Sequence, residues 1–345
     1  MNTDELYDRH QHEMEDFWGR RQTGSRFVRE FFLFDRRVWL SSNDEAALAA
    51  AELSRPLYSQ APPTGRPPIS IELIVRPAPL DPGPAPDDLV RHIQYTGNGN
   101  WLAMHYSMWG HCQVDLAAGR ALAILTPQLA MRPDLVSGWL LNTVFLNLLT
   151  AGGLAMLHAT CLLRNGRAVL LIGAHNTGKS TTALSLVLAG YSLLSDSQVY
   201  LANGQDSVQL MGFPVGRIKL RQDMLASFPA LQPLLEAEQV REETKFVLDL
   251  RQFAPERVQD QAVQPSAVEL CLLARSGDED TRLTPASREE VMQAVMTNSL
   301  HYDTADAWRS NLTLIESLVN QARWHHLAIG SRPEAIVTAL EKLWA

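Results

Sequence analysis

A short segment in the middle of the chain carries the residue types that bind phosphate groups. Residues 173–180 read GAHNTGKS, which matches the pattern G-x-x-x-x-G-K-[ST], and Thr181 follows directly. Glycines at both ends of such a loop let the backbone turn tightly, so that successive N–H groups point at phosphate oxygens. The positive N-terminal end of a following helix adds to this attraction. The pattern therefore predicts a loop that binds a nucleoside triphosphate, with ATP as the expected ligand.

The residues of this loop have separate expected roles. Lys179 would reach the β- and γ-phosphates, and the Ser180 hydroxyl would complete a Mg²⁺ shell made otherwise of phosphate and water oxygens. His175 is unusual at its position, and a solvent-facing side chain is the simpler interpretation than a phosphate contact. The residues expected to bind the nucleotide are Gly173, Ala174, His175, Asn176, Thr177, Gly178, Lys179, Ser180 and Thr181.

The segments on either side of the loop fit this role. Residues 168–172 (AVLLI) form a short apolar run that is typical of a strand buried on both faces. Asn165 and Gly166 precede it and both tolerate positive φ, which predicts a two-residue hairpin turn. After the loop, apolar residues recur at helical spacing until Gly190. The sequence therefore predicts a buried strand, the loop and a helix in succession.

Residues 157–200 resemble the catalytic core of the HPr kinase/phosphorylase family and its serine-kinase relatives. The resemblance lies in His158, the phosphate loop, Ala189-Gly190-Tyr191, Leu193-Leu194 and Asp196-Ser197. Residues 212–214 and 326–330 are similar more loosely. The family shares its fold with ATP-dependent phosphoenolpyruvate carboxykinase. The resemblance implies phosphoryl transfer from ATP to a hydroxyl, often a protein serine, and it suggests a homo-oligomer.

By this resemblance Asp196 takes the place of the first of two aspartates, as general base toward the acceptor hydroxyl and as a metal ligand. A carboxylate at the end of a strand beside the loop would also lie near the γ-phosphate on geometric grounds. His158 would orient Asp196 or the acceptor, although a histidine in such a place is more often a core residue. Ser197 replaces the second aspartate of the family, and this loss of charge affects metal affinity and the reverse reaction.

A strand with three cations follows later. Residues 216–221 (GRIKLR) alternate, so Arg217 and Lys219 share a face. They are candidates for binding an anionic substrate or phosphate, and an edge strand protected by charge is an equally good interpretation. Residues 246–249 (FVLD) are the nearest candidate for a second acidic strand that holds a metal. Lys245 and Asp249 are better interpreted as a surface pair.

Composition limits the classes of function. The 345 residues include 30 basic and 38 acidic side chains, a net charge of −8, which argues against a nucleic-acid surface. Residues 136–157 are almost long enough to span a bilayer, but amides and two glycines interrupt them, and they predict a buried amphipathic helix. The charged N-terminus lacks the pattern of a signal peptide, and the three scattered cysteines indicate a reducing compartment. We therefore expect a soluble, cytoplasmic protein without a membrane or nucleic-acid partner.

The expected fold class is α/β (α+β), in two domains. Residues 1–135 should form a β-rich N-terminal domain of unknown role, with strands at 101–106, 111–116 and 120–126 and loops through the proline-rich residues 62–86. Residues 136–345 should form a P-loop domain of the HPr kinase and phosphoenolpyruvate carboxykinase type. Ser287 with Glu290, and Ser331 with Glu334, predict helix caps near its end.

Three functions remain open from the sequence. The first is an ATP-dependent kinase that phosphorylates a hydroxyl, with a serine of a protein or peptide as the expected acceptor. The second is a catalytically degenerate ATP-binding regulator or scaffold, which the neutral Ser197 favours. The third, a hydrolase or motor ATPase, lacks a convincing second acidic strand. No base-reading motif distinguishes ATP from GTP.

Overall fold

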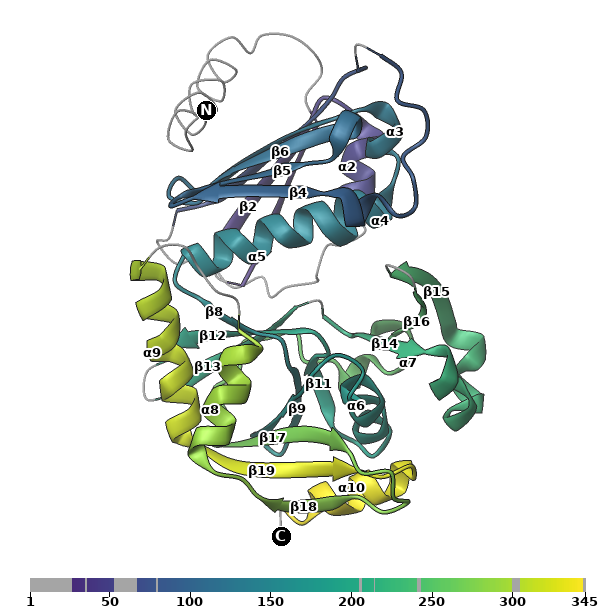
Figure 1. Cartoon of the computed structure of the whole chain (residues 1–345), viewed down its shortest axis with the longest axis vertical. Helices are drawn as coiled ribbons and strands as arrows, with labels where there is room; N and C mark the ends of the chain where they lie inside the picture. Colours follow the sequence, from purple (N-terminus) through teal and green to yellow (C-terminus); the bar gives the residue numbers. More distant parts are fainter. Residues whose placement is uncertain are drawn as a thin grey trace. The chain divides into compact units, whose positions relative to one another are not determined.

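The computed structural model describes residues 27–34, 36–52, 67–78, 80–204, 207–213, 215–240, 243–299 and 305–343. The chain divides into two compact units, with the main boundary between Gly153 and Leu154 (Figure 1). This boundary lies later than the expected one after residue 135. The reason is that the apolar helix we expected to open the second domain packs within the first unit.

The first unit contains a seven-stranded sheet in the order β1-β2-β3-β7-β6-β5-β4. Strand β3 pairs in parallel with β2 and β7, and the other neighbours are antiparallel. The strands β5 to β7 lie where alternation predicts them. The strands are β1 Phe27–Leu33, β2 Arg36–Ser42, β3 Ile69–Val75, β4 Gln94–Asn98, β5 Trp101–His105, β6 Gly110–Asp115 and β7 Arg120–Leu125.

Strand β3 corrects the expectation of loops through residues 62–86. Its sequence ISIELIV buries Ile69, Ile71 and Leu73 completely between two parallel neighbours. A run of β-branched and apolar residues favours a buried strand, and here it outweighs the surrounding prolines, which stay outside the strand.

The helices of the first unit pack on this sheet. Helix α5 buries Val144, Phe145, Leu148 and Leu149, and the Phe145 ring meets Phe31 of β1 edge to face at 6.2 Å. One helical stretch in the described chain, Pro133–Ala151, is long and apolar enough to cross a membrane by composition, and 56% of it is buried. Its packing is that of a core helix. The helical segments are α2 Glu45–Glu52, η1 Leu89–His92, η2 Ser107–Trp109, α3 Pro127–Ala130, α4 Pro133–Leu135, the π-helical η3 Val136–Leu141 and α5 Asn142–Ala151.

The second unit is built on a six-stranded mixed sheet in the order β11-β9-β10-β17-β19-β18. Strands β10, β17 and β19 are parallel, and the remaining pairs are antiparallel. Asn165 and Gly166, with φ of 52° and 74°, form the predicted hairpin between β9 and β10. The chain is thus an α+β protein. The strands are β9 Thr160–Arg164, β10 Arg167–Ile172, β11 Ser192–Ser195, β17 Ala267–Arg275, β18 Arg282–Pro285 and β19 Ala322–Ile329.

Hydrophobic cores lie on both faces of this sheet. Helices α6 (Lys179–Leu188) and α10 (Pro333–Glu341) contribute to one core, and α8 (Arg288–Thr297) and α9 (Ala305–Gln321) to the other. Ser287 and Glu290 form the predicted capping box of α8. The expected cap at Ser331 is wrong: α10 begins at Pro333 after Arg332, whose side chain makes no cap hydrogen bond.

Two three-stranded sheets complete the second unit, in the orders β13-β12-β8 and β14-β16-β15. The second of these bears on the candidate site and is called the β14–β16 sheet below. The elements are β8 Ala155–Leu157, β12 Gln198–Asn203, β13 Val208–Phe213, β14 Arg217–Arg221, η4 Gln222–Ser227, η5 Pro229–Leu234, β15 Leu235–Val240, β16 Glu243–Asp249, α7 Leu250–Phe253 and η6 Pro255–Arg257.

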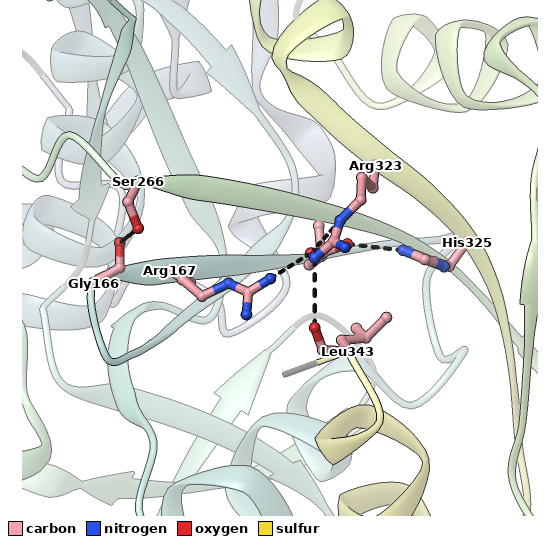
Figure 2. Close-up of polar contacts among 7 residues, drawn as sticks. Gly166, Arg167, Ser266, Arg323, His325 and Leu343 are labelled. Atoms are coloured by element: carbon pink, nitrogen blue, oxygen red, sulfur yellow. Dashed lines mark hydrogen bonds and ion pairs between the residues drawn. The ribbon is translucent and has the colours of Figure 1, made fainter. Parts of the chain in front are cut away.

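A buried carboxylate joins the three parallel strands. Glu269 of β17 has no exposed surface, and its oxygens accept hydrogen bonds from Arg323 Nε and His325 Nε2 of β19, each at 2.8 Å. Arg167 of β10 lies at 3.6 Å, and Figure 2 shows Arg167, Arg323 and His325 converging on one point. A charge can be buried in this way only because it is paired. We call these four residues the Glu269 cluster, and they lie toward the N-terminal ends of the parallel strands.

Candidate functional site

The phosphate loop connects the C-terminal end of β10 to the first residue of α6, as predicted. Gly178 is the N-cap of α6 and has a left-handed φ of 104°. A Cβ atom at Gly178 would collide with the Ile329 side chain of β19, and one at Gly173 would lie 2.8 Å from Thr177 Oγ1. Gly178 is therefore required by its backbone conformation, and at Gly173 the side chain of Thr177 and the backbone of Leu273 leave little space for a Cβ atom.

Lys179 is positioned inside the mouth of this loop. Its side chain is 8% exposed, and its Nζ donates to the carbonyls of Gly173 at 2.6 Å and Ala174 at 3.0 Å. Burial lowers the pKa of Lys179, the carboxylate of Asp196 raises it, and the charge of Lys245 lowers it further. Among the described residues, the hydrogen bonds of the Lys179 ammonium go to backbone carbonyls of the loop, and the carboxylate of Asp196 lies nearby.

Asp196 follows directly after β11 and lies at the same place. The residue is 9% exposed; its Oδ1 accepts from Thr160 Oγ1 at 2.8 Å, and its Oδ2 accepts from the backbone N–H of Lys219 at 3.3 Å. Burial raises the pKa of Asp196 to about 6, against hydrogen bonds from Ser180, Thr160 and Lys219 and the charge of Lys179, which lower it. The site therefore contains a carboxylate that exchanges its proton close to neutral pH.

The turn that presents this carboxylate is fixed by Ser195. Its hydroxyl donates to the carbonyl of Phe213 at 2.9 Å and accepts from the backbone N–H groups of Ser197 and Gln198, each at 3.2 Å. Gly212 of β13 passes so close to β11 that a Cβ there would collide with the backbone of that strand. A hydroxyl and a glycine thus hold the turn in place.

His158 lies between β8 and β9, two residues before β9 begins. Its backbone N–H donates to the carbonyl of Asn298 at 2.8 Å. Burial and the charge of Lys179 lower the pKa of the imidazole, and a hydrogen bond with the backbone of Ser197 raises it. The histidine therefore contacts the residue after Asp196, and its orienting role stays a prediction.

Arg217 and Lys219 alternate with buried neighbours as predicted, but they lie in different surroundings. Arg217 is opposite Asp249 in the β14–β16 sheet. Lys219 supports Asp196 through its backbone N–H, a contribution that its side-chain type does not indicate. The structure therefore brings Lys219 to the candidate site and places Arg217 beside an acid.

The expected surface pair of Lys245 and Asp249 is wrong. Asp249 caps α7 and accepts a hydrogen bond from Arg251 Nε at 2.8 Å. Asp249 is also the acid of residues 246–249 (FVLD), the candidate for a second acidic strand that holds a metal. Here its carboxylate pairs with Arg251. The charge of Lys245 adds a smaller effect to the burial that lowers the pKa of Lys179 and of His158.

The residues at the end of the loop suit Mg²⁺. Ser180 and Asp196 are joined by a hydrogen bond and supply the hard oxygen atoms that this ion prefers. Within the described ranges, no three His, Cys, Asp or Glu side chains gather as a metal site. Two protein oxygens fit an ion that shares its shell with phosphates and water, which is how Mg²⁺ binds beside nucleotides.

Comparisons by sequence find no family and no curated protein similar to the chain. A solved structure of the Hpr(Ser) kinase/phosphatase from Coxiella burnetii aligns with 55% of this chain and 95% of its own, at 12% identity and a TM-score of 0.30. A likeness this low carries no argument about function.

Proposed function

We propose that the chain is an ATP-dependent kinase that transfers the γ-phosphate to a hydroxyl group, with a serine of a protein or peptide as the acceptor. The observation that supports this most directly is the position of Asp196. Its carboxylate is buried and hydrogen-bonded to Ser180 at the end of the phosphate loop. Its charge also raises the pKa of Lys179. A base, a phosphate-binding cation and a metal-binding hydroxyl thus lie together.

The reaction follows from these positions. The acceptor oxygen forms a bond to the γ-phosphorus, its proton passes to Asp196, and the bond from that phosphorus to the β–γ bridging oxygen breaks, which releases ADP. A pKa of about 6 leaves Asp196 mostly ionised at pH 7, so that it accepts the proton. Lys179 binds the phosphate oxygens. Mg²⁺, when bound, neutralises charge on the phosphates.

The regulator or scaffold is the second candidate, and Ser197 favours it. A neutral hydroxyl stands beside Asp196, so the site carries one acid fewer than the family it resembles. Such a protein would bind ATP and use it to select a conformation that a partner recognises. In either case we propose a cytoplasmic protein, and a homo-oligomer remains an expectation from the resemblance.

The test follows Mg²⁺-dependent ATP binding and the fate of a labelled γ-phosphate with candidate protein and peptide acceptors. Lys179→Ala should weaken nucleotide binding. Asp196→Asn should keep binding and lower transfer by roughly 10²- to 10⁴-fold, the usual contribution of a general base. Asp223→Asn is the matched control, because Asp223 is half-exposed and pairs with Arg221 at 3.2 Å.

Two outcomes separate the candidates. Transfer by Asp196→Asn at the wild-type rate would show that Asp196 is not the base. Tight binding that leaves the γ-phosphate in place with every acceptor, together with a partner interaction lost in Lys179→Ala, would support the regulator instead.

A further inference from the structure

Strand β9 lies between the two strands that carry the candidate site. It pairs with β10 on one side and with β11 on the other, and both pairs are antiparallel. Strands β10 and β11 therefore run in the same direction, and both end where β9 begins. The first residue of β9, Thr160, is opposite Leu171 of β10, and the next residue, Cys161, is opposite Ser195 of β11. Thr160 thus lies at the edge where the phosphate loop follows β10 and Asp196 follows β11.

Two hydrogen bonds from different strands hold separate oxygens of the Asp196 carboxylate. Thr160 Oγ1 donates to Oδ1 at 2.8 Å, a usual length for a bond between oxygen atoms. The backbone N–H of Lys219 donates to Oδ2 at 3.3 Å, which is longer than most N–H···O bonds. Because the two donors act on different oxygens, they limit the rotation of the carboxylate, and Thr160 makes the shorter bond of the two.

Packing alone does not account for a threonine at this position. The side chain has no exposed surface, and the residues that follow it in β9, Cys161 and Leu162, are buried and apolar. A buried hydroxyl loses its hydrogen bonds to water, so valine would fit an apolar interior at lower cost if the hydroxyl had no partner. Here the carboxylate of Asp196 is that partner. The hydroxyl therefore points to a role that involves Asp196.

We propose that Thr160 is a positioning residue for phosphoryl transfer, which holds Oδ1 of Asp196 so that the carboxylate faces the acceptor hydroxyl in one orientation. Thr160 acts through Asp196 and not on the reacting atoms. This inference rests on the proposed function, in which the acceptor proton passes to Asp196. It adds that the rate of transfer depends on the direction of the carboxylate, because a general base must lie within hydrogen-bond reach of the proton it takes.

The test compares Thr160→Val, which removes the hydroxyl, with Thr160→Ser, which keeps the hydroxyl and removes a methyl group. Thr160→Val should lower kcat roughly 10- to 100-fold, because a small misplacement of a reacting group costs up to about 10²-fold. KM for ATP and the affinity for a non-hydrolysable ATP analogue should change little. Thr160→Ser should keep most of the rate. Thr150→Val is the matched control, since Thr150 of the first unit is also fully buried with a hydrogen-bonded hydroxyl, and it should leave kcat unchanged.

The pair of variants separates positioning from packing. Thr160→Ser leaves a cavity in place of the methyl group, so it would be at least as harmful as Thr160→Val if the residue only filled space. Equal losses of kcat in the two variants would therefore overturn the positioning role. Transfer by Thr160→Val at the wild-type rate would also overturn it.

The hydrogen bond itself is measured without nucleotide or acceptor, by urea unfolding of a double-mutant cycle. Thr160→Val should lower the unfolding midpoint when Asp196 is present and should not lower it in Asp196→Ala, where the hydroxyl has no carboxylate to bind. Equal losses in both backgrounds would show that Thr160 does not act through Asp196. If the cycle shows coupling but wild type transfers no phosphate to any acceptor, the proposed function fails and the positioning role fails with it. A wild type that transfers phosphate at a rate independent of Thr160 overturns this inference alone.

Discussion

Asp196 is surrounded by hydroxyl and amide donors, and yet its pKa is raised to about 6. Burial disfavours the ionised carboxylate by more than the hydrogen bonds from Thr160, Ser180 and Lys219 favour it. The folded protein therefore carries an energetic cost at neutral pH. Groups held in this way are frequent at functional sites, where a base must exchange its proton near the working pH.

The cost at Asp196 predicts a dependence of stability on pH. The pKa rises from 3.8 to about 6 on folding, so the folded protein binds more protons than the unfolded chain between these values, and stability falls as pH rises through this window. Asparagine does not titrate. Relative to wild type, Asp196→Asn should therefore gain up to about 3 kcal/mol between pH 4 and pH 7.5, from about two units at ~1.4 kcal/mol each.

Urea unfolding of both proteins without nucleotide, at several pH values, measures this gain. The half-exposed Asp223 provides the control, because Asp223→Asn makes the same chemical change at the surface, outside the site. A difference between Asp196→Asn and wild type that is constant with pH would contradict the raised pKa.

The sequence predicts some of these residues and not others, for a physical reason. The loop and Asp196 are local features, one a pattern of glycines and a lysine, the other an acid at the end of a strand. Thr160 and the backbone N–H of Lys219 reach Asp196 only through the pairing of strands that are distant along the chain. A threonine in an apolar strand and a lysine in an alternating one carry no local signal of such a role.

At the scale of elements, the junction of the loop and α6 depends on close packing. Gly178 combines a left-handed backbone with a position directly against Ile329, so that β19 limits the space at the start of the helix. Strand β19 thus carries Arg323 and His325 of the Glu269 cluster near its N-terminal end and Ile329, which lies against Gly178, at its C-terminal end.

Gly178→Ala should damage both stability and nucleotide binding. The left-handed conformation costs about 1–2 kcal/mol for a residue with a Cβ atom, and the contact with Ile329 adds about 1–3 kcal/mol of overpacking. Gly277→Ala is the matched control, because Gly277 has a φ of 76° and no atom within 4 Å of an added Cβ. Chemical unfolding and calorimetry with ATP measure the two effects. Equal destabilisation of the two variants would mean that Ile329 moves aside without cost.

Elements with a local signal agree with the sequence. The hairpin at Asn165 and Gly166 and the capping box at Ser287 need only neighbouring residues. The errors lie where distant contacts decide. Strand β3 forms because two parallel partners enclose it, and the cap of α10 fails because Arg332, not Ser331, precedes the helix.

At the scale of the whole molecule, each unit has its own sheet and its own buried residues. Unfolding of a protein with separate cores is not expected to be a single two-state transition. The phosphate loop and Asp196 both belong to the second unit. A nucleotide should therefore act on the stability of only one of the two.

We expect two transitions on unfolding, of which a non-hydrolysable ATP analogue with Mg²⁺ shifts only one. At a ligand concentration of 100 times Kd, the stabilisation should be about 2.7 kcal/mol. Replacing tryptophans by phenylalanine within one unit assigns each transition by fluorescence. The described tryptophans are Trp39, Trp101, Trp109 and Trp139 in the first unit and Trp308 and Trp324 in the second. A single transition that the analogue shifts as a whole would show that the units unfold together.

The Glu269 cluster also restricts how this sequence can change over evolutionary time. The buried Glu269 carboxylate is compensated by Arg167, Arg323 and His325, whose own side chains are partly exposed, so loss of these partners would leave a charge unpaired in the interior. Breaking a buried pair in this way costs about 3–5 kcal/mol, a large part of the stability of most domains. Replacing all four residues with apolar side chains of similar volume could instead be neutral. Descendants of this chain should therefore keep the four residues or exchange them as a set, since the single steps between the two states are the unstable ones.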